Sequence, residues 1–396
     1  MKIYNSLTRK IEQFTPIKDN EIKIYVCGIT PYDTTHLGHA FTYVMFDVLV
    51  RFLTFSGYKV TYTQNVTDID DDILKKAKKE KRDWRELGDF WTKNFLKDMK
   101  SLNVLPPTHY VKATDSIVKI VEIVQLLIDK GFAYEREGNV YFDVDKFKDY
   151  GNLSHYSKGQ MMLISKERGA DPNDPNKKNP LDFVLWQKFK DDEPYWNSPF
   201  GKGRPGWHIE CSAMIHQYLG ETIYIHGGGR DLIFPHHESE IAQSESYTGK
   251  KSFVKYWMHT AMVIYQGEKM SKSLGNLVMV SHLLKKYSAN EIRYVLLSHH
   301  YRKPWEFEEE ELKKAKILMQ KIVRKSSDVY LASHLKGGNV DSDEKNHLNK
   351  KTLENFEKIM NNDFDVPKVL LLFPELLKSN DIHTLIYIMR ILGFSV

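Results

Sequence analysis

The stretch that decides the fold of this chain is Tyr25-Val-Cys-Gly-Ile-Thr-Pro-Tyr-Asp-Thr-Thr-His-Leu-Gly-His-Ala40. It predicts a buried strand, a tight turn built on glycine and proline, and the first turn of a helix that carries two histidines. Ligands bind at such a crest in α/β proteins, because the N–H groups at the start of the helix point toward anions. Cys27 lies at the end of the predicted strand.

The elements on either side of this stretch predict a doubly wound α/β fold. Residues 22–28 form an apolar run, and residues 38–56 carry apolar side chains at helical spacing. A second strand is predicted over 58–66. Acidic residues from Asp68 to Asp72 favour the start of another helix, where they complement its dipole. Strand, helix, strand and helix in this order begin a doubly wound parallel sheet.

An insertion interrupts this alternation. Residues 114–130 have the pattern of an amphipathic helix, whereas 166–180 are polar and rich in proline and glycine, as in a surface loop. Alternation of strands and helices resumes at Gly206. We therefore expect residues 103–205 to be inserted between two halves of one nucleotide-binding domain.

After Gly206 we expect a helix over 206–219, a strand over 222–225, a turn at Gly227-Gly-Gly229 and a helix over 236–247. A further strand is predicted over 256–264. The pattern then becomes helical, with helices predicted over 279–287, 289–298, 308–333, 346–361 and 366–392.

The composition indicates a folded chain without a membrane span. Of the 396 residues, 41% are hydrophobic and 28% charged, and the apolar run over 117–128 is broken by charges at helical spacing. The net charge of +5 is compatible with a partner that carries phosphates. Two cysteines, far apart, and no apolar N-terminal leader favour a reducing, cytosolic location.

Four side chains are candidates for a zinc site: Cys27, Cys211, His236 and Glu240. His236 and Glu240 are four residues apart on a predicted helix and therefore share a face. Thiolate, imidazole and carboxylate together suit Zn²⁺. Because neither cysteine belongs to a Cys-x-x-Cys pair, the alternative is two buried cysteines and an unrelated helix.

Two further motifs are candidates for phosphate binding. In His36-Leu-Gly-His39, Gly38 would let a phosphate approach the backbone and both imidazoles could donate to it. Lys269-Met-Ser-Lys-Ser273 could clamp a transferring phosphate. The alternatives are capping histidines and a solvated loop.

The order of these two motifs resembles class I aminoacyl-tRNA synthetases, and the chain is most similar to the cysteinyl-tRNA synthetases. The similarity covers essentially the whole chain. The stretches that carry it are Tyr25–Thr30, Asn65–Asp71, Asn179–Trp186, Gly203–Met214, His226–Gly229, Asp231–Gln243 and His299–Arg302.

The resemblance implies a zinc ion held by Cys27, Cys211, His236 and Glu240 that binds the thiolate of the substrate L-cysteine. A hydroxyl is a poorer ligand than a soft sulfur, so serine would be rejected without an editing domain. The resemblance further implies three residues that line the amino-acid pocket: Trp207, Thr30 and Asp231.

For ATP, which would enter with Mg²⁺, the resemblance implies that His36 and His39 bind the phosphates. Lys269 and Lys272 would stabilise charge on the pyrophosphate side of the transition state. Further nucleotide contacts are expected from Gly38, Gly228 and Asp231.

The same resemblance implies a Rossmann-like catalytic domain in two halves, 1–102 and 206–278, the latter with the Lys-Met-Ser-Lys-Ser loop. The connective insertion, 103–205, would separate them. Residues 279–396 would form a helical stem-contact region and a shortened helix bundle. We expect a cytoplasmic monomer that charges tRNA.

Two alternatives for the second substrate remain. Several local features, such as Phe41 and the segment 167–175, resemble the mycothiol-pathway ligase that passes cysteine to the amine of glucosaminyl inositol. The chain also stops soon after Gly393, where we expect a synthetase to continue into its anticodon-binding region. Glu240 and a basic stripe over 313–325 favour tRNA. A non-catalytic RNA-binding paralogue is disfavoured because the zinc set and both phosphate motifs are intact.

Overall fold

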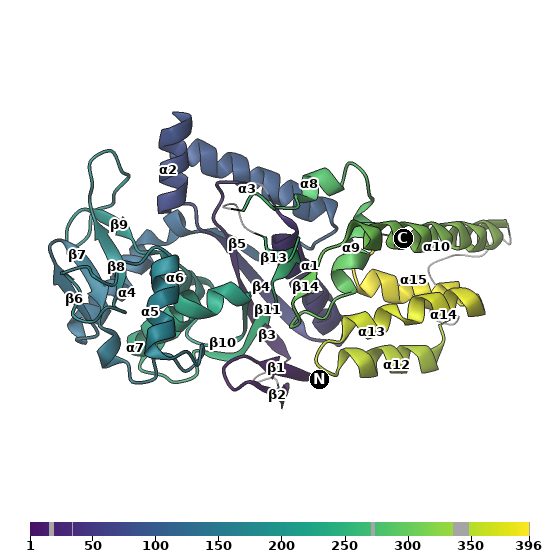
Figure 1. The fold of residues 1–396 in the computed structure, drawn as a ribbon. Helices are drawn as coiled ribbons and strands as arrows, with labels where there is room; N and C mark the ends of the chain where they lie inside the picture. Colours follow the sequence, from purple (N-terminus) through teal and green to yellow (C-terminus); the bar gives the residue numbers. More distant parts are fainter. Residues whose placement is uncertain (16–19, 34, 271–273, 336–347, 396) are drawn as a thin grey trace.

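The structure is a computed structural model of the chain, and it describes residues 1–15, 20–33, 35–270, 274–335 and 348–395 (Figure 1). Its centre is a parallel sheet in the order β11-β10-β3-β4-β5. The strands of this sheet are β3 (Glu21–Ile29), β4 (Lys59–Val66), β5 (His109–Lys112), β10 (Ile223–Gly229) and β11 (Val254–Thr260). The reversal of order between β3 and β10 marks a doubly wound sheet.

Strand β3 separates two hydrophobic cores. Ile24 and Val26 pack with helix α1 (Leu37–Phe55), whereas Tyr25 and Cys27 pack with helix α6 (Trp207–Tyr218) on the other face. Successive side chains of a strand point to opposite faces, so this alternation directs Cys27 toward α6 and away from α1. The predicted α/β fold is confirmed.

Helix α1 is the central helix of the first core. Its N-cap is His36, whose Nδ1 accepts a hydrogen bond from the backbone N–H of Gly38 at 3.1 Å. Among the described residues, α1 is the one helix long and apolar enough to cross a membrane, but 78% of that window is buried inside the protein. Its apolar character thus serves packing.

Between β5 and β10 the chain builds a second, antiparallel sheet with its own core. Its strands, in the order in which they pair, are β6 (Ala133–Arg136), β7 (Asn139–Phe142), β8 (Phe183–Lys188) and β9 (Gly203–Pro205). The helices α4 (Ile117–Asp129) and α5 (Lys158–Glu167) accompany this sheet on the left of Figure 1. The 3₁₀ turns of this part are η1 (Ala113–Ser116) and η2 (Val144–Lys146).

The expected turn at Gly227-Gly-Gly229 is wrong, because these residues complete strand β10 and pair with Met258, His259 and Thr260 of β11. Glycine is required there by close packing. A Cβ atom on Gly227 would lie 2.2 Å from the ring of Phe46, and one on Gly228 would lie 2.9 Å from Leu232. Turn η3 (Arg230–Leu232) and the kinked turn η4 (Ile233–His237) then lead into α7 (Glu238–Thr248).

Two helices, α2 (Asp71–Glu80) and α3 (Trp84–Ser101), connect β4 to β5. A hairpin of β1 (Lys2–Asn5) and β2 (Lys10–Gln13) lies at the N-terminus. A small sheet in the order β13-β12-β14 follows β11. Its strands are β12 (Val263–Tyr265), β13 (Glu268–Lys269) and β14 (Trp305–Glu306).

The C-terminal part is helical and lies on the right of Figure 1. Its helices are α8 (Val280–Leu283), α9 (Ala289–Leu297), α10 (Glu309–Leu335), α12 (Lys350–Met360), α13 (Val366–Leu370), α14 (Leu372–Ser379) and α15 (Ile382–Ile391). The single helix expected over 366–392 is therefore wrong. The chain turns at Asn380, which adopts φ 60°, before Asp381 caps α15.

Candidate active site and metal centre

A cavity of about 710 Å³ opens at the carboxyl ends of β3, β10 and β11, beside the start of α1. Its walls bring together most of the residues that the sequence singled out. Those lining it are Cys27, Thr30, His36, Gly38, His39, Trp207, Cys211, Asp231 and His236. Residues separated by up to 209 positions thus face one space.

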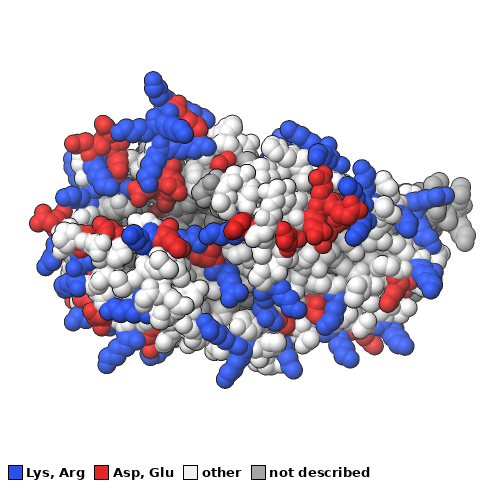
Figure 2. All heavy atoms as spheres, viewed as in Figure 1, with Lys and Arg blue, Asp and Glu red and all other residues white. Residues whose placement is uncertain are grey.

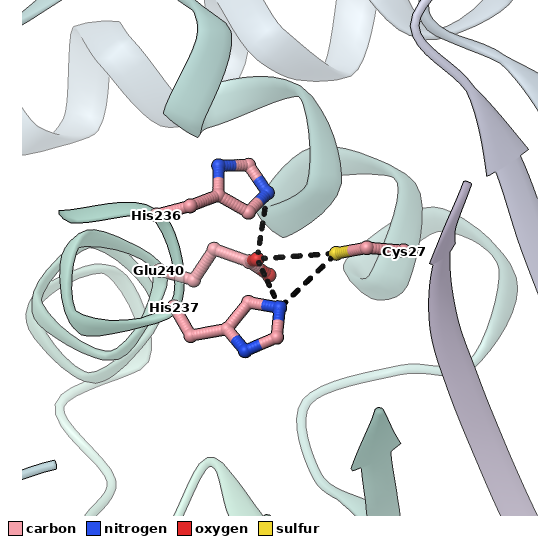
Figure 3. Close-up of side chains that lie close together, drawn as sticks. All are labelled: Cys27, His236, His237 and Glu240. Atoms are coloured by element: carbon pink, nitrogen blue, oxygen red, sulfur yellow. Dashed lines mark hydrogen bonds and ion pairs between the residues drawn. The ribbon is translucent and has the colours of Figure 1, made fainter. Parts of the chain in front are cut away.

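At one end of the cavity, Cys27, His236, His237 and Glu240 place their ligand atoms within 4.8 Å of one another (Figure 3). Glu240 Oε1 lies 3.1 Å from His236 Nε2 and 3.8 Å from Cys27 Sγ. All four side chains are buried. The spacing of ligand atoms suits a small divalent cation, and the mixture of sulfur, nitrogen and oxygen donors is that of zinc.

The structure brings Cys211 to this cluster as well. Its Sγ lies 3.9 Å from Cys27 Sγ, and both cysteines line the cavity together with His236. Strand β3 and helix α6 carry the two thiols, and both belong to one buried core. Cys211 is not within the tight group that includes His237, so five donors surround the site.

His237 is the functional candidate that the sequence reasoning missed. Its Nε2 lies 3.3 Å from Cys27 Sγ, and its Nδ1 lies 2.8 Å from His259 Nε2. The signal was the adjacent pair His236-His237, but a regular helix would point the two rings in different directions. Both histidines lie at the end of the kinked turn η4, in which Phe234 has φ −137° and ψ 136°, and both imidazoles lie at the cluster.

Further polar groups contact the polar atoms of these side chains that point away from the cluster, and so orient them. Glu240 Oε2 lies 2.9 Å from His226 Nε2, and His236 Nδ1 lies 3.1 Å from His208 Nδ1. His259 Nδ1 in turn lies 2.8 Å from the Ser6 hydroxyl. Hydrogen bonds of this kind hold metal-binding imidazoles and carboxylates in one orientation.

Electrostatics favour the neutral forms of these groups when protein alone surrounds them. Burial raises the pKa of the Cys27 thiol and that of the Glu240 carboxyl well above their usual values. Burial also lowers the pKa of His236 and that of His237 well below the usual value. A bound divalent cation would stabilise the thiolate and carboxylate forms that burial disfavours, and neutral imidazole is already the form that binds metals.

At the other end of the cavity, His36 and His39 stand at the start of α1. Their rings stack with centroids 3.7 Å apart and an interplanar angle of 26°. Gly38 lies between them, where a Cβ atom would come within 2.9 Å of the His36 ring. The first turn of the helix and the paired rings form a donor-rich surface toward the cavity, which suits an anion.

Three other predicted residues have different surroundings. Trp207 stacks on His236 with ring centroids 4.5 Å apart, so it forms part of the wall beside the metal candidates. Asp231 lies 3.4 Å from Arg168, which comes from the inserted segment and also lines the cavity. Gly228 packs against Leu232 of η3 and His237 of η4 and does not line the cavity.

The lysine-rich motif is described in part. Lys269 is exposed at the end of β13, where its carbonyl accepts from the Asn276 side chain at 3.2 Å. Met270 lines the cavity. Lys272 lies outside the described residues.

The fold has close counterparts among solved structures. A methionyl-tRNA synthetase of Mycobacterium tuberculosis, solved with methionyl-adenylate, matches with a TM-score of 0.65, covering 94% of this chain and 90% of that one at 15% identity. At this identity the match concerns the fold, which is that of class I synthetases.

Sequence comparison identifies a family within the class I tRNA synthetases. The family model described as the class I (C) tRNA synthetase catalytic domain matches residues 13–317. A cysteine--tRNA ligase of Thermodesulfovibrio yellowstonii is 46% identical over 96% of this chain and 78% of its own length, and one of Staphylothermus marinus is 44% identical over 95% and 78%. The chain therefore belongs to the cysteine--tRNA ligase family of class I tRNA synthetases.

Proposed function

We propose that this protein activates L-cysteine with ATP and transfers it to the 3′ end of tRNA(Cys). The observation that carries the proposal is that one cavity has a thiol- and imidazole-rich end and a helix-start end with two histidines. The first end suits a thiol and the second suits phosphates. The names of the relatives support the same reaction.

In the first step a carboxylate oxygen of cysteine attacks the α-phosphorus of ATP, and the bond to the bridging oxygen breaks, so that pyrophosphate leaves with its electron pair. The backbone N–H groups at the start of α1, with His36 and His39, would hold the phosphates in line with the carboxylate. Lys269 and Lys272 would neutralise charge on the leaving pyrophosphate, which Mg²⁺ accompanies. No covalent enzyme intermediate is required.

In the second step a terminal ribose hydroxyl of tRNA attacks the activated carbonyl carbon, and AMP leaves. The relatives' names favour tRNA over a small amine as the acceptor. Comparing tRNA charging with amide formation on glucosaminyl inositol in one preparation tests this choice. Formation of the amide alone would contradict it.

We propose Cys27, Cys211, His236 and Glu240 as the ligands of one zinc ion. The donor set fits zinc, and Cys211 is preferred to His237 because it adds a second thiol, whose Sγ lies 3.9 Å from Cys27 Sγ, and thiolate is a preferred zinc ligand. When bound, zinc supplies affinity for a soft sulfur ligand, which a serine hydroxyl replaces poorly. Thr30, Trp207 and Asp231 would contact the rest of the amino acid, and Gly228 would shape the nucleotide side through its packing.

We further propose that the protein is a cytoplasmic monomer. Its proposed domains are residues 1–102, 103–205, 206–278 and 279–396. Light scattering after size exclusion measures the oligomeric state.

Two measurements test the activation step. The purified protein should contain about one zinc per chain by elemental analysis. Cysteine, but not serine, should support exchange of pyrophosphate into ATP. A protein without zinc that performs neither exchange nor charging would contradict the proposal.

A further inference from the structure

A short segment, residues 75–85, carries an excess of positive charge that stands out from the rest of the chain. It contains seven lysines and arginines and two acidic residues. Its net charge of +5 equals the formal net charge of the whole protein, so the other residues balance one another. The segment covers the second half of α2 and the start of α3.

All of these cations except the partly buried Lys76 are exposed, and several lack an acidic partner among the described residues. Lys78, Lys79 and Lys81 are exposed and form no ion pair with any described residue. Glu80 is shared between Lys76 at 3.6 Å and Arg82 at 3.9 Å. Figure 2 shows the resulting cluster of Lys and Arg over α2, at the top of the molecule.

Aromatic side chains lie among these cations. The ring of Phe90 is 45% exposed, with the Arg82 guanidinium 5.2 Å from its centroid. The Arg85 guanidinium lies 4.4 Å from the ring of Trp84, and the Lys76 ammonium lies 4.8 Å from that of Trp91. Trp84 and Trp91 are partly buried, so Phe90 is the exposed ring of this group. An exposed ring beside cations is a combination with which proteins bind nucleic-acid strands, since every base has a face that can stack.

The position of α2 connects this surface to the active site. Asp70 and Asp72, at the start of the helix, line the cavity. Helix α2 then leads away from the cavity to its exposed end in Figure 1. Asp70 and Asp72 therefore lie beside the cavity, and Lys78 and Lys79 lie near the other end of this helix, which is roughly 15 Å long for ten residues.

We propose that residues 75–85 with Phe90, here called the α2 surface, bind the phosphate backbone of the tRNA whose 3′ end occupies the cavity. The choice of tRNA as the bound partner rests on the proposed function. An acidic protein would satisfy the charges, but the stacking residues favour RNA. The α2 surface would guide the tRNA end by charge, and it would contribute nothing to cysteine activation.

The test is the triple variant Lys78→Gln, Lys79→Gln, Lys81→Gln, compared with a control that removes three other exposed lysines, Lys10→Gln, Lys146→Gln, Lys148→Gln. The α2 variant should raise the KM for tRNA about tenfold at low salt and lower the slope of log KM against log salt by about two. Cysteine-dependent pyrophosphate exchange should stay unchanged. The control should match the unmodified protein in every assay.

A second variant, Phe90→Ala, should weaken tRNA binding about threefold to tenfold without changing the salt slope, since stacking carries no charge. An α2 variant with normal exchange and unchanged KM and salt slope would overturn the proposal. An unchanged Phe90→Ala affinity would overturn the stacking part. If the unmodified protein performs no exchange, the proposed function fails, while tRNA binding measured by fluorescence anisotropy still tests the α2 surface.

Discussion

The buried side chain of Glu240 contacts three neighbours through its two carboxylate oxygens. One carboxylate oxygen faces His236 and Cys27, and the other faces His226 at 2.9 Å. The contact with His226 fixes the rotation of the carboxylate, which leaves the first oxygen aimed at the thiol cluster. A residue held from behind in this way is ready to bind a cation without reorganisation.

Five donor side chains surround the candidate zinc site, and two substitutions distinguish which four of them coordinate the metal. Cys211→Ser should lower zinc affinity by more than a hundredfold, because a hydroxyl is a poor zinc ligand. His237→Gln should lower it by about tenfold to a hundredfold, as expected of an orienting residue. Chelator competition followed by elemental analysis measures both. The reverse order of effects would assign the site to Cys27, His236, His237 and Glu240.

His216 makes stability depend on pH. Burial lowers its pKa to about 4, and neither ring nitrogen has a hydrogen-bond partner within the described chain. The unfolded chain, with a pKa near 6.5, binds the proton first, so stability is complete above pH 6.5 and falls as the pH drops toward 4. The loss should reach about 3 kcal/mol.

Urea unfolding at a series of pH values measures this loss. Other buried histidines contribute over the same range, so His216→Phe should make the fall in stability between pH 6.5 and 4 shallower by the equivalent of one proton, whereas the exposed His282→Phe serves as the control. An identical pH profile for His216→Phe and the unmodified protein would contradict the assignment.

At the scale of elements, a buried ion pair joins helix α1 to helix α9. Asp47 of α1 is fully buried and accepts from Arg293 of α9 and, at 3.0 Å, from Arg51. Arg293 also donates to the carbonyls of Leu392 at 2.8 Å and Leu102 at 3.0 Å. The helix that carries the two active-site histidines is thus anchored to three distant parts of the chain.

Arg293→Met should lower the free energy of unfolding by about 3 to 5 kcal/mol, because it leaves a buried carboxylate with one cation fewer. Arg324→Met, at an exposed position of α10, should change it by less than about 0.5 kcal/mol. Guanidinium titration followed by circular dichroism compares the two. Equal stability of both variants would show that the pair contributes little beyond what methionine packing replaces.

At the scale of the whole molecule, Asp363 connects the N-terminal hairpin, the loop after α9 and the C-terminal helices. Its carboxylate accepts from the Tyr4 backbone at 2.9 Å, the Tyr301 hydroxyl at 2.8 Å and Arg302 Nε at 2.8 Å. Asp363 has φ 57°, a left-handed conformation that aspartate and asparagine tolerate better than most residues. One buried carboxylate therefore docks the helical region on the catalytic body.

Asp363→Ala should cost about 3 kcal/mol or more and should speed hydrogen exchange in α12 to α15 more than in β3 and β4. Asp363→Asn keeps an acceptor and the backbone preference, so its effect should be smaller. Exchange measured by mass spectrometry locates the change. Equal acceleration in the sheet and in the helices would contradict a docking role.

The local pattern of the sequence determined the elements from β3 to β4 and the chemistry of both motifs. A short apolar run predicts the strand over 22–28, which is buried on both faces, whereas apolar side chains at a period of 3.6 residues predict the helix over 38–56. Patterns of this kind need only neighbouring residues. They failed at Gly227–Gly229 and over 366–392, where packing of Phe46 and a turn at Asn380 decided the outcome.

The composition of the metal candidate also came from the sequence, through its resemblance to a family, but its geometry did not. Cys27 and Glu240 are 213 positions apart, and only the parallel pairing of β3 with β10 carries η4 and α7 to the end of β3. His237, at the end of η4, also reaches Cys27 there. Residue types follow from the chain, whereas the meeting of distant side chains depends on strand order, which only the tertiary structure decided.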